Sequence, residues 1–477
     1  MSVSTAAAAA AVAPSACAPL PVLGRDVTVP LVTGGEVAYA ALDYAASAPA
    51  LQRVWDDVAA YAPYYGSVHR GAGYLSQLST DLFENARRTV AAFLDCRIED
   101  SPGEARSGKG GDGRREGDQV IFTRSTTDSL NLLAAALPDD CQVFVFETEH
   151  HAALLPWRTA RVTCLDAPRS PRQAVETLER ALADRDPHGP ALVCVTGASN
   201  VTGELWPVRE LAATAHAHGA RIVLDAAQLA PHHPVSVRDL DVDWVAFSGH
   251  KLYAPFGSGV LAGRADWLRE AEPYLAGGGA SRTVTRRADG GVDVRWHDGA
   301  ARHEAGSPNV IGAYAIASAC TALTEAGFDT LVAREEHLIR TVRDGLADVP
   351  EVRFLSLFGD DAPRVGVLSF VVEGWNSSHF AAALSAEYGI GVRDGLFCAH
   401  PLVRALLGSD PRSQGECGAP EAAPGEKSLN AVRVSFGAGT PDEHVERFVR
   451  AVRELVRDGA RWSYRTEDGR CVPDTSA

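Results

Sequence analysis

Lysine is rare in this chain of 477 residues, and one lysine stands out by its surroundings. Of the 45 lysine and arginine residues only three are lysines, and Lys109 and Lys427 lie in stretches rich in glycine and charge. Lys251, by contrast, follows the largely apolar run 242–247 and precedes a Gly-rich apolar run at 257–261. A buried lysine can lose its proton at working pH, which arginine cannot. Lys251 could therefore form a Schiff base with a carbonyl group, typically that of pyridoxal phosphate (PLP).

Asp225 is a second residue whose position suits this chemistry. It ends the apolar run 221–225, a predicted strand, and Lys251 follows another predicted strand at 244–248. In open parallel sheets, ligands gather at the carboxyl ends of the strands. An aspartate there can pair with the pyridinium nitrogen of PLP and keep it protonated, which makes the ring a better electron sink. The alternative is that Asp225 caps a helix and Lys251 lies at a surface turn. This alternative is less favoured because both residues occur at or just after the ends of predicted strands.

Hydroxyl and imidazole groups follow two other predicted strands. Thr126 and Thr127 lie where a predicted strand meets a predicted helix. Such a helix N-terminus can bind a phosphate, although ordinary N-capping explains the same residues. His150 follows a strand predicted at 143–147, and an imidazole there could stack on a cofactor ring and transfer protons near neutral pH. The adjacent histidine suggests a metal only weakly, because no Asp or Cys lies at ligand spacing, so we expect no metal site.

Two arginines and a cysteine in the last third of the chain could act on a substrate. Arg393 and Arg433 carry guanidinium groups, which bind carboxylates with paired hydrogen bonds, as an amino-acid substrate would require. Cys398 could be a thiolate nucleophile. The alternative for Cys398, one of nine cysteines in the chain, is a buried and inert thiol.

Strands and helices must alternate to position these residues. Strands are expected at 119–123, 143–147, 191–196, 221–225 and 244–248, with helices at 127–136 and 208–218. This alternation predicts βαβ units, a mainly parallel sheet and an α/β fold. Beyond about residue 330, helices are expected at 331–346, 378–388 and 442–456, and strands at 365–372 and 431–436. This second pattern indicates a smaller α+β domain.

The composition sets further limits on the organisation and on the partners. The net charge of −16 argues against nucleic acid or an anionic membrane as the main partner. Scattered cysteines indicate a reducing compartment, and the N-terminus has no basic region typical of a signal peptide, so we expect a cytoplasmic protein. The expected divisions are a disordered tail at 1–24, a large domain at 25–325 with an exposed insertion at 101–118, a small domain at 326–460 with an insertion at 408–427, and a C-terminal tail at 461–477.

Taken together and in this order, these residues resemble the class V aminotransferase family of fold-type I PLP enzymes, and most closely its cysteine desulfurases and selenocysteine lyases. The resemblance runs from about residue 42 to residue 456. It rests on motifs at Leu42–Ala48, Val68–Gly71, Glu149–Ala152, Ser199–Gly203, Asp225–Gln228, Ser248–Lys251 and Glu304–Asn309.

The resemblance implies a role for each candidate residue. Lys251 would be the Schiff-base lysine, Asp225 would pair with the ring nitrogen, and His150 would stack on the ring. Substrate would be bound by Arg433, Arg393, Ala46 and His69, and Cys398 would accept sulfur. The remaining cofactor contacts would be Asn200 and Gln228 near the ring oxygen, and Thr126, Thr127, Ser248, His250 and the partner chain's Ser307 at the phosphate.

The segment around Cys398 departs from the family pattern. Desulfurases of this type usually have Arg-Thr-Gly-His-His-Cys, whereas this chain has Arg-Asp-Gly-Leu-Phe-Cys at 393–398. We therefore expect a homodimeric PLP enzyme that converts cysteine to alanine, leaves a persulfide on Cys398 and passes sulfur to an acceptor protein. The alternatives are an aminotransferase, lyase or epimerase without a catalytic cysteine, and a PLP-binding regulator without catalysis.

Overall fold

A seven-stranded sheet forms the centre of the computed structural model, which describes residues 18–69, 71–98, 117–408, 430–467 and 470–474. The strand order is β4-β10-β9-β8-β7-β5-β6. Strand β10 runs antiparallel to both of its neighbours, and the other strands pair in parallel. The strands are β4 (Asp118–Thr123), β5 (Gln142–Phe146), β6 (Arg161–Leu165), β7 (Ala191–Thr196), β8 (Arg221–Asp225), β9 (Trp244–Ser248) and β10 (Gly259–Arg264).

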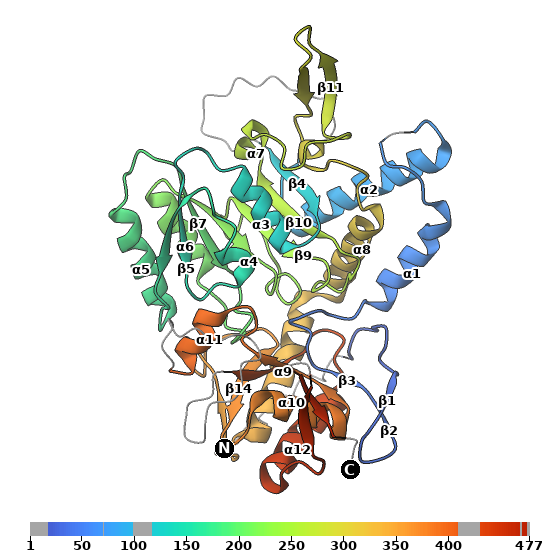
Figure 1. Cartoon of the computed structure of the whole chain (residues 1–477), viewed down its shortest axis with the longest axis vertical. Coiled ribbons are helices and arrows are strands. Elements are labelled where there is room, and N and C mark those ends of the chain that lie inside the picture. The colour runs from blue at the N-terminus through green and yellow to red at the C-terminus, as the bar shows by residue number, and fades with distance from the viewer. Residues whose placement is uncertain (1–17, 70, 99–116, 409–429, 468–469, 475–477) are drawn as a thin grey trace, which may run out of the picture.

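Both faces of this sheet are buried, which explains why its strands have continuous apolar sequences. Alternate residues of β7, such as Val193 and Cys194, belong to two different hydrophobic clusters on opposite faces. One cluster includes side chains from α5 (Pro171–Ala183), α6 (Val208–Ala217) and α8 (Val310–Ala326), and the other includes α3 (Thr126–Ala135). The predicted α/β fold is confirmed, with helices on both faces of the sheet (Figure 1).

The N-terminal helices pack beside α8. Helices α1 (Gln52–Tyr61) and α2 (Tyr74–Phe93) both contact α8, and a 3₁₀ turn, η1 (Ala62–Tyr64), follows α1. The short helices α4 (His151–Leu154) and α7 (Asp266–Glu270) follow β5 and β10, and α7 leads toward a hairpin of β11 (Ser281–Arg286) and β12 (Val292–Trp296). This hairpin projects from the body at the top of Figure 1. A second 3₁₀ turn, η2 (Ala300–His303), precedes α8.

The smaller domain is built on a four-stranded sheet of order β13-β14-β17-β16. Helix α9 (Phe328–Leu346) leads into it, and α10 and α12 pack in its core. These elements match the helices and strands expected beyond residue 330. The remaining elements are β13 (Val352–Phe354), β14 (Val367–Val372), α10 (Ser377–Tyr388), β15 (Ile390–Gly391), β16 (Arg393–Gly395), α11 (His400–Leu406), β17 (Ala431–Ser435) and α12 (Asp442–Asp458).

Both ends of the chain differ from the expected division. The N-terminal strands are β1 (Thr28–Pro30), β2 (Glu36–Ala38) and β3 (Ala40–Ala41), and β3 pairs with β15, so this segment joins the small domain and not the large one. Leu20 donates a backbone hydrogen bond to Ala438, so the expected tail at 1–24 ends in an ordered stretch. The expected C-terminal tail also contains structure, a hairpin of β18 (Tyr464–Glu467) and β19 (Arg470–Pro473).

The C-terminal hairpin is fixed by a buried carboxylate. The Tyr464 hydroxyl donates to Glu387 on α10 at 2.9 Å, and the backbone N–H groups of Arg461 and Trp462 donate to the same carboxylate. The two predicted insertions fall almost wholly outside the described residues. Within the described ranges no single helix is long and apolar enough to cross a membrane, and only α8 and α9 taken together, across a bend of 83°, pass that test.

Candidate active site

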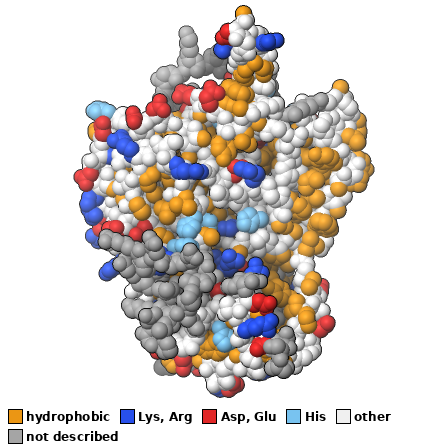
Figure 2. Space-filling view, in the orientation of Figure 1, with side chains coloured by type: hydrophobic (Ala, Val, Ile, Leu, Met, Phe, Trp, Pro, Cys, Tyr) orange, Lys and Arg blue, Asp and Glu red, His pale blue; other side chains and the backbone are white. Residues whose placement is uncertain are grey.

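The carboxyl ends of four neighbouring strands bring the predicted cofactor residues together. Asp225 ends β8 and Ser248 ends β9, two strands that pair directly. Thr196 ends β7 in register with Asp225, and its N–H donates at 3.0 Å to Glu149, which follows β5. These side chains share one edge of the sheet, where parallel sheets bind ligands. In the space-filling view, histidine and basic side chains gather in the middle of the face, between the two domains (Figure 2).

Lys251 lies three residues beyond the end of β9, and its charge is disfavoured there. Removal from water lowers the pKa of its ammonium to about 8, although the negative charge of Asp225 opposes the shift. The positive charge of Arg433 lowers the pKa of Lys251 further. The neutral amine is therefore much more abundant near neutral pH than it is for an exposed lysine, which favours a nucleophilic role.

Two buried carboxyl groups face the same region. Asp225 accepts a hydrogen bond from the Ala227 N–H at 2.9 Å, yet burial raises its pKa above the ordinary aspartate value. Burial, together with the charge of Asp225, raises the pKa of Glu149 well above its ordinary value. One oxygen of Glu149 has no hydrogen-bond partner among the described residues. The two carboxyls thus lie where a positively charged group would be stabilised, and the sequence motif at 149–152 had suggested no role for Glu149.

Hydroxyl groups lie at the start of α3, where a phosphate site is predicted. Ser125 caps α3 by accepting from the Asp128 N–H at 3.3 Å. The Ser248 hydroxyl accepts from the Thr126 N–H and contacts the Thr126 hydroxyl, both at 2.7 Å. Thr127 is exposed at the same helix end. Because the dipole of a ten-residue helix also favours an anion here, these groups suit a phosphate.

His150 is held as a neutral ring with a defined orientation. Its Nδ1 accepts from the Ala152 N–H at 3.0 Å, so its remaining proton is on Nε2. Burial lowers the pKa of His150 to about 3, and the positive charge of Lys251 adds to the effect. A neutral ring fixed in this way suits stacking against an aromatic cofactor.

The loop at 43–48 lies against the cofactor residues. Gln228 donates to the Ala45 carbonyl at 2.7 Å, and Ala48 donates to the His250 carbonyl at 2.9 Å. Ala46 therefore lies within this loop, next to the segment that carries Lys251. The contacts place Gln228 and His250 beside this loop, and the roles expected for Gln228, His250 and Ala46 stay predictions.

Arg433 is a buried cation in the small domain, on β17. Its Nη2 donates to Asp43 at 2.8 Å and its Nη1 donates to the Asn200 carbonyl at 3.0 Å. The guanidinium lies 5.1 Å from the ring centre of Phe397, and its Nε has no partner among the described atoms. Arg433 therefore retains a buried donor that a carboxylate could occupy. Arg393 pairs with Arg433 in strand register but is exposed.

Cys398 is exposed and belongs to the same electrostatic site. A thiolate at Cys398 would raise the pKa of both Lys251 and Arg433. Phe397 and Cys398 both have positive φ angles, 52° and 54°, which non-glycine residues rarely adopt. The Phe397 carbonyl accepts from Asn200 at 2.8 Å, so the cysteine segment is connected to the cofactor region.

Two predicted residues lie apart from this group. His69 contacts α2 through Glu84, at 3.0 Å, and through the ring of Phe83. Ser307 is exposed in the segment just before α8. Both remain predictions, and the expectation that Ser307 acts from a partner chain is compatible with its exposure. Sequence reasoning gave no role to Asp43, although it lies within the recognised motif at 42–48.

The donor set of this site fits PLP. It combines a lysine whose pKa is lowered by burial to about 8, a buried aspartate, a neutral imidazole and hydroxyl groups at a helix N-terminus. Among the described residues no group of three or more His, Cys, Asp or Glu side chains is placed to hold a metal.

Comparison with known proteins decides the family. Residues 40–101 and 113–448 match the family described as Aminotransferase class-V. The chain belongs to this family. A probable cysteine desulfurase of Halobacterium salinarum is 36% identical over 395 residues, covering 81% of this chain and 87% of that protein. A cysteine desulfurase of Salmonella typhimurium is 32% identical over 398 residues, covering 81% and 89%.

Solved structures agree with this assignment. The apo cysteine desulfurase of Thermococcus onnurineus superposes with a TM-score of 0.72 at 29% identity, and the cysteine desulfurase CsdA of Escherichia coli with 0.69 at 29%. Each covers 88% of this chain and 95% of its own. The chain is thus a cysteine desulfurase-like enzyme of the class-V family, whose members depend on PLP.

Proposed function

We propose that this chain is a PLP-dependent cysteine desulfurase that converts cysteine to alanine and leaves a persulfide on Cys398. One observation carries the proposal: Cys398 is exposed, and a thiolate there is close enough to raise the pKa of both Lys251 and Arg433. A nucleophilic thiol, a proton-transferring amine and a carboxylate-binding cation are the three groups that desulfuration needs. The similarity to cysteine desulfurases supports the choice of substrate.

Each protein group has a defined task in this reaction. Arg433 binds the substrate carboxylate, with its unpartnered Nε as a free donor. Asp225 would hold the ring nitrogen of PLP in its protonated form, and PLP, when bound, would supply the electron sink that allows bonds near the substrate Cα to break. His150, neutral and oriented by the Ala152 N–H, would hold the ring by stacking against it.

The residues Lys251 and Cys398 carry out the transfer steps. The amine of Lys251, with its pKa near 8, removes the substrate Cα proton and later returns a proton to the product. The Cys398 thiolate attacks the substrate sulfur, so a sulfur–sulfur bond forms as the substrate carbon–sulfur bond breaks. The sulfur atom moves from cysteine to the enzyme, and the three-carbon product is alanine.

Replacement of Cys398 by alanine tests the proposal. We expect the purified Cys398→Ala variant to bind PLP as the unchanged protein does, judged by its absorbance. Release of alanine from cysteine should fall by at least about a hundredfold, because the sulfur has no thiol to accept it. Cys164→Ala is the matched control, since Cys164 is also exposed but lies on the edge strand β6.

Unchanged alanine release from Cys398→Ala would contradict the desulfurase proposal. A keto-acid product or consumption of amino acids that lack sulfur would then favour an aminotransferase, lyase or epimerase. The apolar pair Leu396 and Phe397, in place of the two histidines usual in desulfurases, is the observation that keeps this second function in view.

We also propose a cytoplasmic homodimer that passes sulfur to an acceptor protein. The exposure of Ser307, which the family resemblance assigns to a neighbouring subunit's phosphate site, supports the dimer. The exposure of Cys398 leaves its thiol accessible to an acceptor. A monomer in sedimentation equilibrium at micromolar concentration would contradict the dimer.

A further inference from the structure

The two residues before Cys398 are part of an apolar core. Leu396 is 2% exposed and Phe397 is 6% exposed, and both belong to a cluster with Leu402 and Val403 of α11. Aliphatic and aromatic side chains here fill the space beneath the cysteine segment. The imidazoles that the desulfurase pattern places at these two positions are therefore absent from this part of the described chain.

Two other histidines lie beside Cys398 instead. His151 begins α4 and His400 begins α11, two residues after the cysteine. Their rings meet edge to face with centroids 4.6 Å apart. The backbone N–H of His151 also donates to the Cys398 carbonyl at 2.8 Å. The backbone of His151 thus holds Cys398 directly. The ring of His151 also packs on the ring of His400, two residues after the cysteine.

The cysteine segment needs such support because its backbone is strained. Two consecutive residues without a glycine's freedom, Phe397 and Cys398, adopt left-handed φ angles, and conformations of this kind persist only where the surroundings enforce them. Asn200 fixes the first carbonyl and His151 fixes the second. Loss of either contact should let the segment relax.

The surroundings of the two imidazoles favour their neutral forms. Burial lowers the pKa of His151, and burial, the charge of His151 and that of Arg404 on α11 lower the pKa of His400. On the other side of His151 lies His150, which is close to Lys251 and Arg433. The groups that act on the pair are thus cationic when charged, so protonation of both rings would set like charges against each other.

We propose that His151 and His400 form a clasp that positions Cys398, and that this ring contact opens when both imidazoles become protonated. The purpose of the clasp rests on the proposed function, because it would keep the thiol directed toward the substrate sulfur. The two histidines are positioning residues, because they act on Cys398 through its backbone and do not touch the reacting atoms.

The test compares His400→Phe with His400→Ala in the PLP-loaded enzyme, from about pH 5 to about pH 8. Two readouts need no turnover: hydrogen exchange of the peptide that contains the His151 N–H, and the rate at which iodoacetamide labels Cys398, measured by mass spectrometry. Phenylalanine keeps the edge-to-face packing but cannot be protonated. His188→Phe, in the exposed loop after α5, is the matched control.

We expect His400→Phe to match the unchanged enzyme near pH 8 and to differ from it near pH 5. At the acid end the unchanged enzyme should exchange the His151 N–H and label Cys398 roughly three- to tenfold faster than His400→Phe, the range expected for loss of one aromatic contact. His400→Ala should show the faster rates at every pH. The variant-to-unchanged ratio at each pH cancels the ionisation of the thiol itself.

The clasp would be overturned if the ratio of the His400→Phe rates to those of the unchanged enzyme stayed constant with pH. It would also be overturned if the His151 N–H remained protected from exchange in His400→Ala. Neither result depends on desulfuration. A failed clasp with normal alanine release would leave the proposed function standing. If the exchange and labelling rates support the clasp but no alanine is released from cysteine, the thiol is positioned for another reaction.

Discussion

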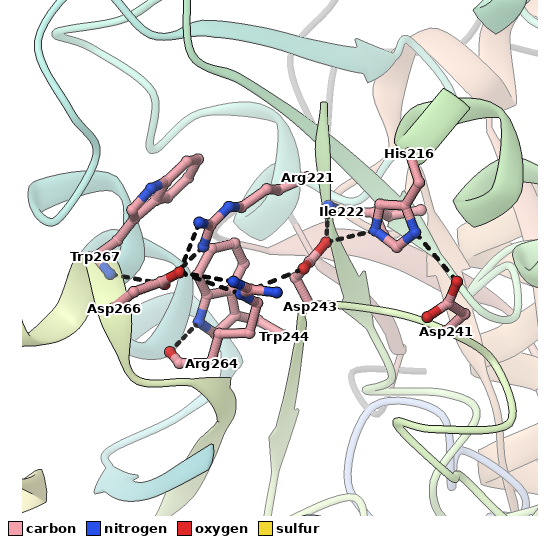
Figure 3. A network of polar contacts seen from close by, with 9 residues as sticks. All are labelled: His216, Arg221, Ile222, Asp241, Asp243, Trp244, Arg264, Asp266 and Trp267. Atoms are coloured by element: carbon pink, nitrogen blue, oxygen red, sulfur yellow. Dashed lines mark hydrogen bonds and ion pairs between the residues drawn. The ribbon is translucent and has the colours of Figure 1, made fainter. Parts of the chain in front are cut away.

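The two ends of strands β8 and β9 are built in opposite ways. Their carboxyl ends carry the candidate active site, where Asp225 and Glu149 are buried close together and Lys251 is largely shielded from solvent. Their amino ends carry Arg221 and Asp243, which belong to a network of alternating charges (Figure 3). At one end burial shifts the pKa values of the side chains away from their ordinary values, whereas at the other end charges lie beside opposite charges.

The two carboxylates Asp243 and Asp266, in the network at the amino ends, each have several hydrogen-bond partners. Asp243 accepts from the His216 ring and from the Ile222 N–H, both at 2.9 Å. Asp266 accepts a hydrogen bond from Arg221 at 2.6 Å and forms a second ion-pair contact with it at 2.6 Å, and it accepts a further hydrogen bond from Arg264 at 3.0 Å.

Aromatic rings complete this network. The Arg221 guanidinium lies 4.5 Å from the ring centre of Trp267 and 5.4 Å from that of Trp244. Such stacking buries the apolar face of the guanidinium while its edge stays bonded to Asp266. The comparison teaches that the same two strands have one stabilising end and one end where burial shifts the pKa values of the side chains and leaves an oxygen of the neighbouring Glu149 without a partner among the described residues. Binding of a cofactor would relieve the second end, since it supplies the missing partners.

Lys251→Ala should abolish catalysis without lowering the stability of the fold. We expect turnover to fall by about 10²- to 10⁴-fold or more, because the amine that moves the Cα proton is lost. The free energy of unfolding of the cofactor-free protein should not fall, since the residue removed pays a desolvation cost in the native state. Alanine release and chemical denaturation measure the two effects.

A cofactor-free Lys251→Ala protein that unfolds more easily than its parent would contradict the comparison. It would mean that Lys251 supports the strand end by packing. Lys251→Arg is a useful companion, because arginine keeps a charge but cannot supply a neutral amine, and it too should be inactive.

Asp243→Ala should lower the stability of the fold and leave catalysis nearly unchanged. We expect the free energy of unfolding to fall by about 2–4 kcal/mol, because the Ile222 N–H and His216 lose their acceptor within a buried environment. Activity per folded molecule should stay near that of the parent, since the site is at the other end of the strands. Urea unfolding and alanine release at a temperature well below the midpoint measure this. Activity loss without loss of stability would show that the two ends are not separable.

The cofactor end of the sheet could be predicted because its signal is local. Asp225 ends one short apolar run and Lys251 follows another, and the strands predicted at 221–225 and 244–248 have the same bounds in the structure. A parallel sheet then brings strand ends together by its geometry alone. Consecutive residues therefore carry enough information to place most of the cofactor contacts.

Contacts between distant segments could not be predicted in this way. Arg433 and Asp43 are 390 positions apart and meet only because the N-terminal segment crosses to the small domain. His151 and His400 meet because two helices from different domains begin at the same place. The C-terminal hairpin follows from Glu387, whose carboxylate binds a segment about 75 residues later. Patterns of hydrophobicity do not encode such pairings, since each depends on the whole fold.

His216→Gln offers the finest comparison of the two ends, because it changes stability in a pH-dependent way. The hydrogen bond to Asp243, together with the charges of Asp243 and Asp241, raises the pKa of His216 above its unfolded value of 6.5. The protonated ring therefore contributes stability that is fully present below about pH 6.5 and is lost as the pH rises through the folded pKa.

We expect His216→Gln to lower the free energy of unfolding by about 0.5–1 kcal/mol near pH 6, in proportion to a partly exposed ion pair. The difference from the parent should shrink by about pH 9, where the ring is neutral in both states and glutamine can still donate to Asp243. Urea unfolding at both pH values measures the change, with His188→Gln as the control for an exposed histidine. A difference that grows with pH would show that His216 is held neutral, as His150 is at the other end of the sheet, and the contrast between the two ends would then fail at this residue.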